Sequence, residues 1–387
     1  MVKHSRLPKL SSGACEKEFA SLLELSARLG CEPMLVQANN GNTSAKLDGV
    51  LWIKASGKCL ANAKREQTFV PVELAAIKDS LRNNMEIART NIPECQLQPS
   101  IETAMHAVLP HHVVVHVHSV NTIAWAIRED GPRQLSKRLA GLYWQWVPYV
   151  PSGIPLARQI EKILRDAPET NIFVLGNHGL VVCGKDCECV DALLRDVERR
   201  LAIVPRPSPE PVAGLFAVMS RSSQWRFPDF QALHALGTDA ISRMILRKGI
   251  LYPCQLIFLG PKLTMLPCSV PLSRLADYFT GRAEAQSYAI VEGGGVIVNE
   301  KINRAEYETL IALMQVVQRI EPSAPLRYLT ETEISSVLAD GTHRYRESVM
   351  AGYPPGAGST LSARESGVGS TLSAPGSAAG STLSPPD

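Results

Sequence analysis

The chain has 387 residues, of which 45% are hydrophobic and 20% charged, and its formal net charge is +3. This balance is typical of a globular protein, and the scattered charge favours neither a nucleic-acid partner nor an anionic membrane. We expect no membrane span and no signal peptide, because no run of about 18 apolar residues exists and no apolar stretch follows the basic N-terminus. Nine cysteines, an odd and dispersed set, favour reduced thiols and a cytoplasmic location.

The length predicts two domains, because one hydrophobic core seldom serves so long a chain. Residues 205–211 include four prolines and are typical of a break between domains. From about Gly352, Gly, Ser, Pro and Ala dominate, and the segment 358–363 recurs with a period of 11 residues, which predicts disorder. The expected parts are an N-terminal segment (1–14), a first domain (15–205), a linker (206–214), a smaller second domain (215–350) and a disordered tail (351–387).

Hydrophobic periodicity predicts helices and strands in both halves of the chain. Helical spacing recurs at 16–29, from Pro71 to 81, at 100–109, at 121–140 with a break at Gly131-Pro132, at 155–164 and at 189–201. Strands are predicted at 50–54, 113–120, 143–150 and 171–182. In the second half we predict a helix at 230–246, a buried strand at 255–260, a hairpin at 288–298 and helices at 304–320 and 331–338.

His116 and His118 lie one residue apart in the apolar run 113–120. Residues i and i+2 of a β-strand point to the same face, so both imidazoles would enter one pocket. Zinc binds imidazole nitrogen at about 2.0–2.1 Å, and a catalytic zinc site takes three protein ligands and keeps one position open. His178, in the apolar run 171–182, is the candidate third ligand. Alone, the His-x-His pair is also consistent with two hydrogen-bonded core histidines.

Two other segments supply polar groups. With Ser100 as the helix N-cap, Glu102 would lie in the first turn, where the helix dipole favours a carboxylate. Next to a metal, the same carboxylate is a candidate general base. The turn-forming residues 39–44 and 55–58 flank the strand at 50–54 and would offer backbone N–H groups to an anion, although a plain hairpin has the same pattern.

Five motifs occur in the order that the class II aldolase/adducin family uses. They are Gly41-Asn42-Thr43-Ser44, Lys54-Ala55-Ser56-Gly57, Pro99-Ser100-Ile101-Glu102, His116-Val117-His118 and Asn177-His178-Gly179-Leu180. Residues 15–205 resemble this family, and most of all its rhamnulose-1-phosphate aldolase-type branch. The resemblance implies a three-layer α/β/α fold with a central, mainly antiparallel sheet, assembled as a homotetramer. A smaller α+β domain, residues 215–350, resembles a C-terminal domain of uncharacterised class II aldolase-like proteins.

The resemblance also implies roles for individual residues. His116, His118 and His178 would bind Zn²⁺ or another divalent metal, and Glu102 would be the catalytic acid/base. The residues implied to bind a substrate phosphate are Asn42, Ser56, Gly57 and Ser100.

The implied activity is that of a zinc-dependent aldolase, a lyase of carbohydrate metabolism. It would cleave a ketose or ketose phosphate through a metal-stabilised enediolate. Two alternatives stay open: a sugar-phosphate epimerase or dehydratase that uses the same metal, and a non-catalytic interaction module like the head domain of adducin.

Overall fold

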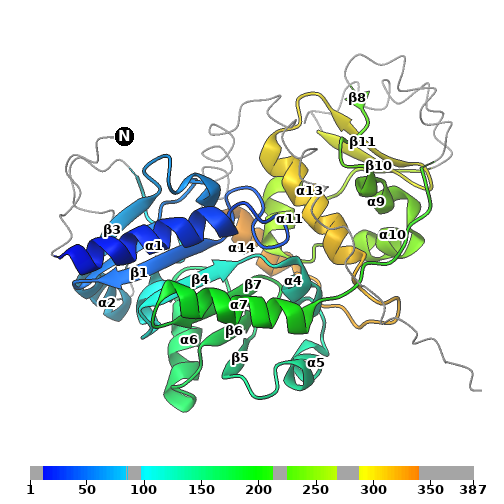
Figure 1. Cartoon of the computed structure of the whole chain (residues 1–387). Helices are drawn as coiled ribbons and strands as arrows, with labels where there is room; N and C mark the ends of the chain where they lie inside the picture. Colours follow the sequence, from blue (N-terminus) through cyan, green and yellow to red (C-terminus); the bar gives the residue numbers. More distant parts are fainter. Residues whose placement is uncertain (1–11, 84, 86–96, 212–224, 268–286, 340–387) are drawn as a thin grey trace, which may run out of the picture.

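Figure 1 shows the computed structural model of the chain. The structure describes residues 12–83, 85, 97–211, 225–267 and 287–339. The expected tail, most of the expected N-terminal segment and residues 212–214 of the expected linker lie outside these ranges. Within the described ranges, no helix has the length and apolar character needed to cross a membrane.

The first domain is built on a seven-stranded sheet with the strand order β3-β2-β1-β4-β7-β6-β5. The strands are β1 (Asn42–Leu47), β2 (Val50–Lys54), β3 (Phe69–Glu73), β4 (Val113–Val117), β5 (Trp144–Val147), β6 (Ile172–Leu175) and β7 (Gly179–Gly184). Neighbouring strands are antiparallel, except that β5 and β6 are parallel. The predicted mainly antiparallel sheet is therefore confirmed.

Helices cover both faces of this sheet (Figure 1). Because side chains alternate along a strand, Val115 of β4 packs in a cluster with α1 and α7, whereas Val114 packs in a cluster with α3 and α6. The helices on one face are α1 (Gly13–Leu29), α4 (Val120–Ala126), α5 (Gly131–Arg138) and α7 (Cys187–Leu201). Those on the other face are α2 (Leu74–Arg82), α3 (Thr103–Val108) and α6 (Ile154–Asp166). The three-layer α/β/α architecture is confirmed.

The second domain contains a smaller, four-stranded sheet with the order β8-β11-β10-β9. Its strands are β8 (Trp225–Arg226), β9 (Met265–Leu266), β10 (Tyr288–Val291) and β11 (Gly295–Asn299). Its helices are η2 (Gln231–His234), α9 (Ala235–Thr238), α10 (Ala240–Arg247), α11 (Pro253–Leu259), α13 (Arg304–Val317) and α14 (Glu331–Ala339). The hairpin of β10 and β11 confirms the strand–turn–strand prediction for 288–298.

The predicted strand at 255–260 is wrong, because this segment forms helix α11. The apolar run is too short for periodicity to distinguish a buried strand from a buried helix. Pro253 stands in the first turn of α11, where its missing N–H leaves no hydrogen bond unmade. The Gln255 side chain also accepts a hydrogen bond from the Leu251 N–H at 2.9 Å.

Pro71 does not begin a helix, since it lies within β3 and α2 begins at Leu74. Proline cannot donate to a sheet ladder, so it is tolerated chiefly on an edge strand. β3 is an edge strand of the first sheet. The predicted break in the helix at Gly131-Pro132 is present, and α5 begins at Gly131.

One apolar cluster joins the two domains. Ile123 of α4 and Ile127 just after it are buried with Leu236 of α9 and with Leu313 and Val317 of α13. Figure 1 shows α13 lying close to α4. The second domain therefore shares a hydrophobic core with the first.

Arg206, in the expected linker, is bonded to the second domain. Its guanidinium lies 2.5 Å from the Asp239 carboxylate and 3.3 Å from the Ser242 hydroxyl. This end of the linker is therefore held against α10 and its N-cap.

We expect Ile123→Ala to lower the free energy of unfolding by about 2–5 kcal/mol, because it leaves a cavity in the core that both domains share. Urea or thermal denaturation measures the effect. Val204→Ala, at a position that is 87% exposed, is the matched control and should change stability by less than about 0.5 kcal/mol. Equal stability of the two variants would contradict the shared core.

Candidate metal centre

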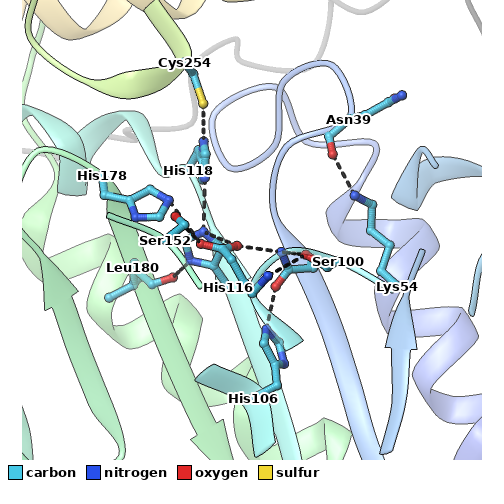
Figure 2. Close-up of polar contacts among 12 residues, drawn as sticks. Asn39, Lys54, Ser100, His106, His116, His118, Ser152, His178, Leu180 and Cys254 are labelled. Carbon is cyan, nitrogen blue, oxygen red and sulfur yellow. Dashed lines mark hydrogen bonds and ion pairs between the residues drawn. The ribbon is translucent and has the colours of Figure 1, made fainter. Parts of the chain in front are cut away.

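Three imidazoles converge at one end of the first sheet (Figure 2). His116 lies on the central strand β4, His118 follows that strand, and His178 precedes β7. All three are buried, and their ligand-capable nitrogens lie within 4.8 Å of one another. The Nε2 atoms of His116 and His118 are 3.1 Å apart. The structure thus brings together the three residues that the sequence proposed as ligands.

Close backbone packing makes this convergence possible. β4 and β7 are adjacent, and His116 pairs with Val181 in their register. A Cβ atom at Gly179 would lie 2.6 Å from the Val117 carbonyl oxygen and 3.3 Å from Cε1 of His116. Only glycine therefore lets the His178 turn come so close to the first two imidazoles.

Hydrogen bonds on the far side of two rings fix their orientation. Nδ1–H of His116 donates to the Leu180 carbonyl at 3.0 Å, and Nδ1 of His118 lies 3.3 Å from Sγ of Cys254. A neutral imidazole carries one N–H and one lone pair, so the bond to the Leu180 carbonyl leaves Nε2 of His116 as the lone-pair nitrogen. Nε2 of His118 is likewise a lone-pair nitrogen when Nδ1–H of that ring donates to the Cys254 sulfur. Burial lowers the pKa of His178 to about 4 and that of His118 below its usual range. Neutral imidazoles are the form that binds a metal.

Glu102 reaches the same centre from the N-terminus of α3. Its Oε2 lies 3.4 Å from Nε2 of His116, and its Oε1 lies 3.4 Å from Nε2 of His178. Burial raises the pKa of this carboxyl, but the facing imidazoles and a hydrogen bond from Asn42 outweigh burial and hold the pKa well below its usual range. Asn42 Nδ2 donates to Oε2 at 2.7 Å, and the Ser152 hydroxyl donates to Oε1 at 3.3 Å. Glu102 is therefore an ionised carboxylate among potential metal ligands.

The predicted N-cap at Ser100 is displaced, because α3 begins at Thr103 and Glu102 occupies the N-cap position. Ser100 instead lies beside Glu102. Its hydroxyl oxygen accepts hydrogen bonds from Asn42 Nδ2 at 3.1 Å and from the Glu102 N–H at 3.3 Å. The serine thus contributes to the position of the carboxylate rather than to the cap of the helix.

His106 is a site residue that the sequence reasoning missed. Asn42 donates to a carboxylate through Nδ2, so its Oδ1 is an acceptor and Nε2–H of His106 must donate to it. Burial keeps the pKa of His106 well below its usual range, so Nδ1 is unprotonated and accepts from the Ser44 hydroxyl at 2.7 Å. This chain of hydrogen bonds fixes Glu102. The spacing from Glu102 to His106, one helical turn, is the sequence signal that could have indicated it.

The residues expected to bind phosphate lie on neighbouring segments. Ala55 pairs with Pro99, and the Ser56 N–H donates to the Gln98 carbonyl at 2.8 Å, so Ser56 and Gly57 lie beside Ser100. Gly57 has φ +73°, a conformation that favours glycine. Asn42, the fourth expected residue, is buried, and its amide is bonded to Glu102, Ser100 and His106.

The buried cation Lys54 lies under this loop, and the sequence reasoning did not single it out. Its ammonium donates to the Asn39 carbonyl at 2.7 Å, and the Asn39 side chain donates to the Gly57 carbonyl at 2.6 Å. Burial lowers the pKa of Lys54 to about 8. The loop at Gly57 is therefore tied, through Asn39, to a lysine inside the domain.

The donor set suits a divalent metal. Nε2 of His116 and Nε2 of His118 lie 3.1 Å apart, so either a proton on one of them or a cation lies between them. Imidazole nitrogens that bind a tetrahedral zinc ion at 2.0–2.1 Å lie about 3.3 Å apart. The observed spacing is close to that value.

Comparison with known proteins shows which family the first domain is similar to. Residues 20–203 match the family described as Class II Aldolase and Adducin N-terminal domain. This part of the chain is therefore similar to class II aldolase/adducin domains. The match spans nearly the same residues as the resemblance noted from the motifs, which is thereby confirmed.

This part of the chain is also similar to an individual curated protein. The uncharacterized oxidoreductase YuxG of Bacillus subtilis (strain 168) is 29% identical over 209 residues, 49% of this chain and 29% of that protein. The match thus spans less than a third of that relative.

Solved structures also resemble part of the chain, among them the following two. The N-terminal class II aldolase domain of a conserved protein from Thermoplasma acidophilum is 21% identical with a TM-score of 0.43, over 52% of this chain and 97% of that one. L-fuculose-1-phosphate aldolase from Thermus thermophilus is 18% identical with a TM-score of 0.35, over 48% of this chain and 91% of that one.

We expect Asn42→Ala to lower the free energy of unfolding by about 1–3 kcal/mol, because it leaves a buried carboxylate oxygen and a buried imidazole N–H without partners. Asn62→Ala is the matched control, since the Asn62 amide also donates to a carboxylate, that of Glu66, at 2.8 Å, but in a part-buried position. Urea denaturation compares the two. Similar losses in both variants would show that the hydrogen-bond chain around Glu102 adds no stability.

Proposed function

We propose that the chain is a metal-dependent class II aldolase, a lyase that cleaves a ketose or ketose phosphate. One observation carries the proposal: an ionised carboxylate, Glu102, lies 3.4 Å from two of three buried imidazoles that can share one metal. A purely structural histidine cluster has no need of a buried carboxylate, which is costly to desolvate. A general base beside a metal does need one.

His116, His118 and His178 would hold the metal, which we propose to be zinc. When bound, the metal supplies a Lewis acid that stabilises negative charge on substrate oxygens. In the cleavage direction the hydroxyl β to the ketose carbonyl loses its proton as the carbon–carbon bond breaks. An aldehyde leaves, and the remaining fragment takes up a proton at carbon.

Glu102 is placed to carry that proton. Its two oxygens face the imidazoles, while Asn42 and Ser152 donate hydrogen bonds that hold the carboxylate in position. General acid–base catalysis of this kind contributes about 10²–10⁴-fold to the rate. We propose that Ser56, Gly57 and Ser100 bind the phosphate of a phosphorylated substrate. Asn42 would support them by positioning Ser100, because both N–H groups of its amide are donated to Glu102 and Ser100.

An epimerase or dehydratase would use the same ligands and the same carboxylate, so the products distinguish these reactions. A panel of ketoses and ketose phosphates, assayed with added zinc, should release an aldehyde. Interconversion of isomers or loss of water would favour the alternatives. A non-catalytic adducin-like module would give none of these products.

We further propose that the protein is cytoplasmic and forms a homotetramer with sites at subunit interfaces. Ile101, between Ser100 and Glu102 in sequence, is 62% exposed. An apolar side chain at the rim of the site supports a neighbouring subunit that covers it.

We expect His116→Ala to lose bound metal and turnover together, whereas Glu102→Gln keeps the metal and lowers kcat by about 10²–10⁴-fold. Metal analysis of the purified proteins and a steady-state assay measure both quantities. His112→Ala, which removes a surface contact with Glu18, should change neither. Less than about a tenth of an equivalent of metal in the purified wild type would overturn both enzyme proposals.

We expect Ser56→Ala to raise KM for a ketose phosphate by about tenfold or more, since a hydrogen bond to a charged group contributes roughly 1.5–3 kcal/mol. KM for the unphosphorylated ketose should stay within about twofold, because the lost contact is to the phosphate. Steady-state kinetics on the matched pair of substrates tests this. An equal change for both substrates would assign Ser56 another role.

A further inference from the structure

We propose that the second domain helps to form the metal centre. It fixes the orientation of His118 and the position of His178. Metal binding and the packing of the two domains therefore stabilise each other. This inference rests on the metal site proposed above. It assigns a role to a domain for which the sequence indicated none. Three separate contacts between the domains support this inference.

The first contact is made by Cys254, near the start of α11. Its sulfur lies 3.3 Å from Nδ1 of His118, across a sequence separation of 136 residues (Figure 2). With Nε2 of His118 bound to the proposed metal, Nδ1 carries the proton, so Nδ1–H is the donor and the Cys254 sulfur the acceptor. Partners on the outer nitrogen set the tautomer and the ring orientation of a metal-ligating histidine. Here that partner belongs to the second domain.

The second contact holds the turn that carries His178. Asn177 has φ +51° and is fully buried. Its Nδ2 donates to the carbonyls of Leu251 at 2.8 Å and of Arg327 at 2.9 Å, and its Oδ1 accepts from Nη1 of Arg327 at 3.0 Å. All these hydrogen bonds of the Asn177 side chain run to the second domain. The residue next to a metal ligand is thus anchored outside the domain that contains the ligand.

The third contact holds the loop that leads into β1. The Glu308 carboxylate of α13 accepts a hydrogen bond from the Ala38 N–H at 2.5 Å, where Ala38 has φ +53°. Within the same loop, Gln37 donates to the His118 carbonyl at 3.3 Å. The second domain therefore also contacts, at Ala38, the loop whose Gln37 bonds the backbone of His118.

These contacts predict thermodynamic coupling. A metal that binds only when the imidazoles are correctly placed favours the state in which the second domain is docked, and docking favours metal binding by the same factor. Interface contacts that served packing alone would change stability without changing metal affinity. Metal affinity therefore separates the two roles.

The test measures Zn²⁺ and Co²⁺ affinity of the metal-free full-length chain by competition with a chelating dye. We expect Cys254→Ala and Asn177→Gly to weaken binding about 10–100-fold, the usual effect of removing an outer partner of a metal ligand. Glycine at 177 keeps the positive φ without strain. Arg327→Met keeps the carbonyl acceptors of Asn177 and removes the bond to Oδ1, together with the Arg327 ion pair to Glu333 and its contact with the Tyr149 ring. Cys254→Ser should recover most of the affinity, because a hydroxyl oxygen can accept the same hydrogen bond.

Two controls match these changes. Cys183→Ala removes a buried thiol with a 3.3 Å contact to the Asn171 carbonyl, and Arg247→Ala removes an ion pair with Glu292 within the second domain. Both should keep wild-type affinity even where Tm falls. The rise in Tm on adding zinc should shrink in the Cys254→Ala and Asn177→Gly variants but not in the controls.

The outcomes are distinct. If the wild type binds no metal, the proposed function fails and this inference fails with it. If the wild type binds metal and the Cys254 and Asn177 variants bind it within about twofold, the metal site stands and the role of the second domain is refuted. Equal weakening in the controls would also refute it, since the effect would then be one of general stability.

Discussion

Glu102 is a buried carboxylate that faces two imidazoles, and a carboxylate in such surroundings stays ionised only when hydrogen bonds and cations stabilise its charge. The first domain supplies those hydrogen bonds through a chain of side chains, each holding the next. Asn42 contacts Glu102 directly, His106 orients Asn42, and Ser44 orients His106. The residues come from β1 and α3, so the packing of this helix on the sheet is what holds the carboxylate in place.

The same packing explains where the imidazoles lie. β4 is the central strand and is bonded to β1 on one side and β7 on the other. Asn42 pairs with His116 in the register of β1 and β4. The amide that holds the Glu102 carboxylate therefore lies opposite the His116 imidazole. A shift of one residue in that register would turn one of them to the other face of the sheet. The site therefore depends on strand register as much as on the identity of its residues.

Much of this site could be predicted from the sequence, because its signals are local. The period-two alternation around His116 and His118 indicated a shared pocket, and the order of five short motifs indicated the domain. The remainder depends on contacts between distant segments. Cys254 lies 136 residues from His118 and Arg327 lies 150 residues from Asn177, and no periodicity records such pairs. Helix α11, whose residues 255–259 were predicted to form a strand, brings Cys254 to the site.

The charges at the centre explain why the donor set favours a cation. Burial keeps the imidazoles of His118 and His178 neutral, whereas Glu102 is ionised. Glu102 therefore places a negative charge in a site with little access to water, and the buried ammonium of Lys54 is bonded to the Asn39 carbonyl. Uncompensated charge in such a site costs several kcal/mol. A divalent cation would reverse the sign of the charge, and a site with excess positive charge stabilises the negative charge that develops on a cleaved ketose.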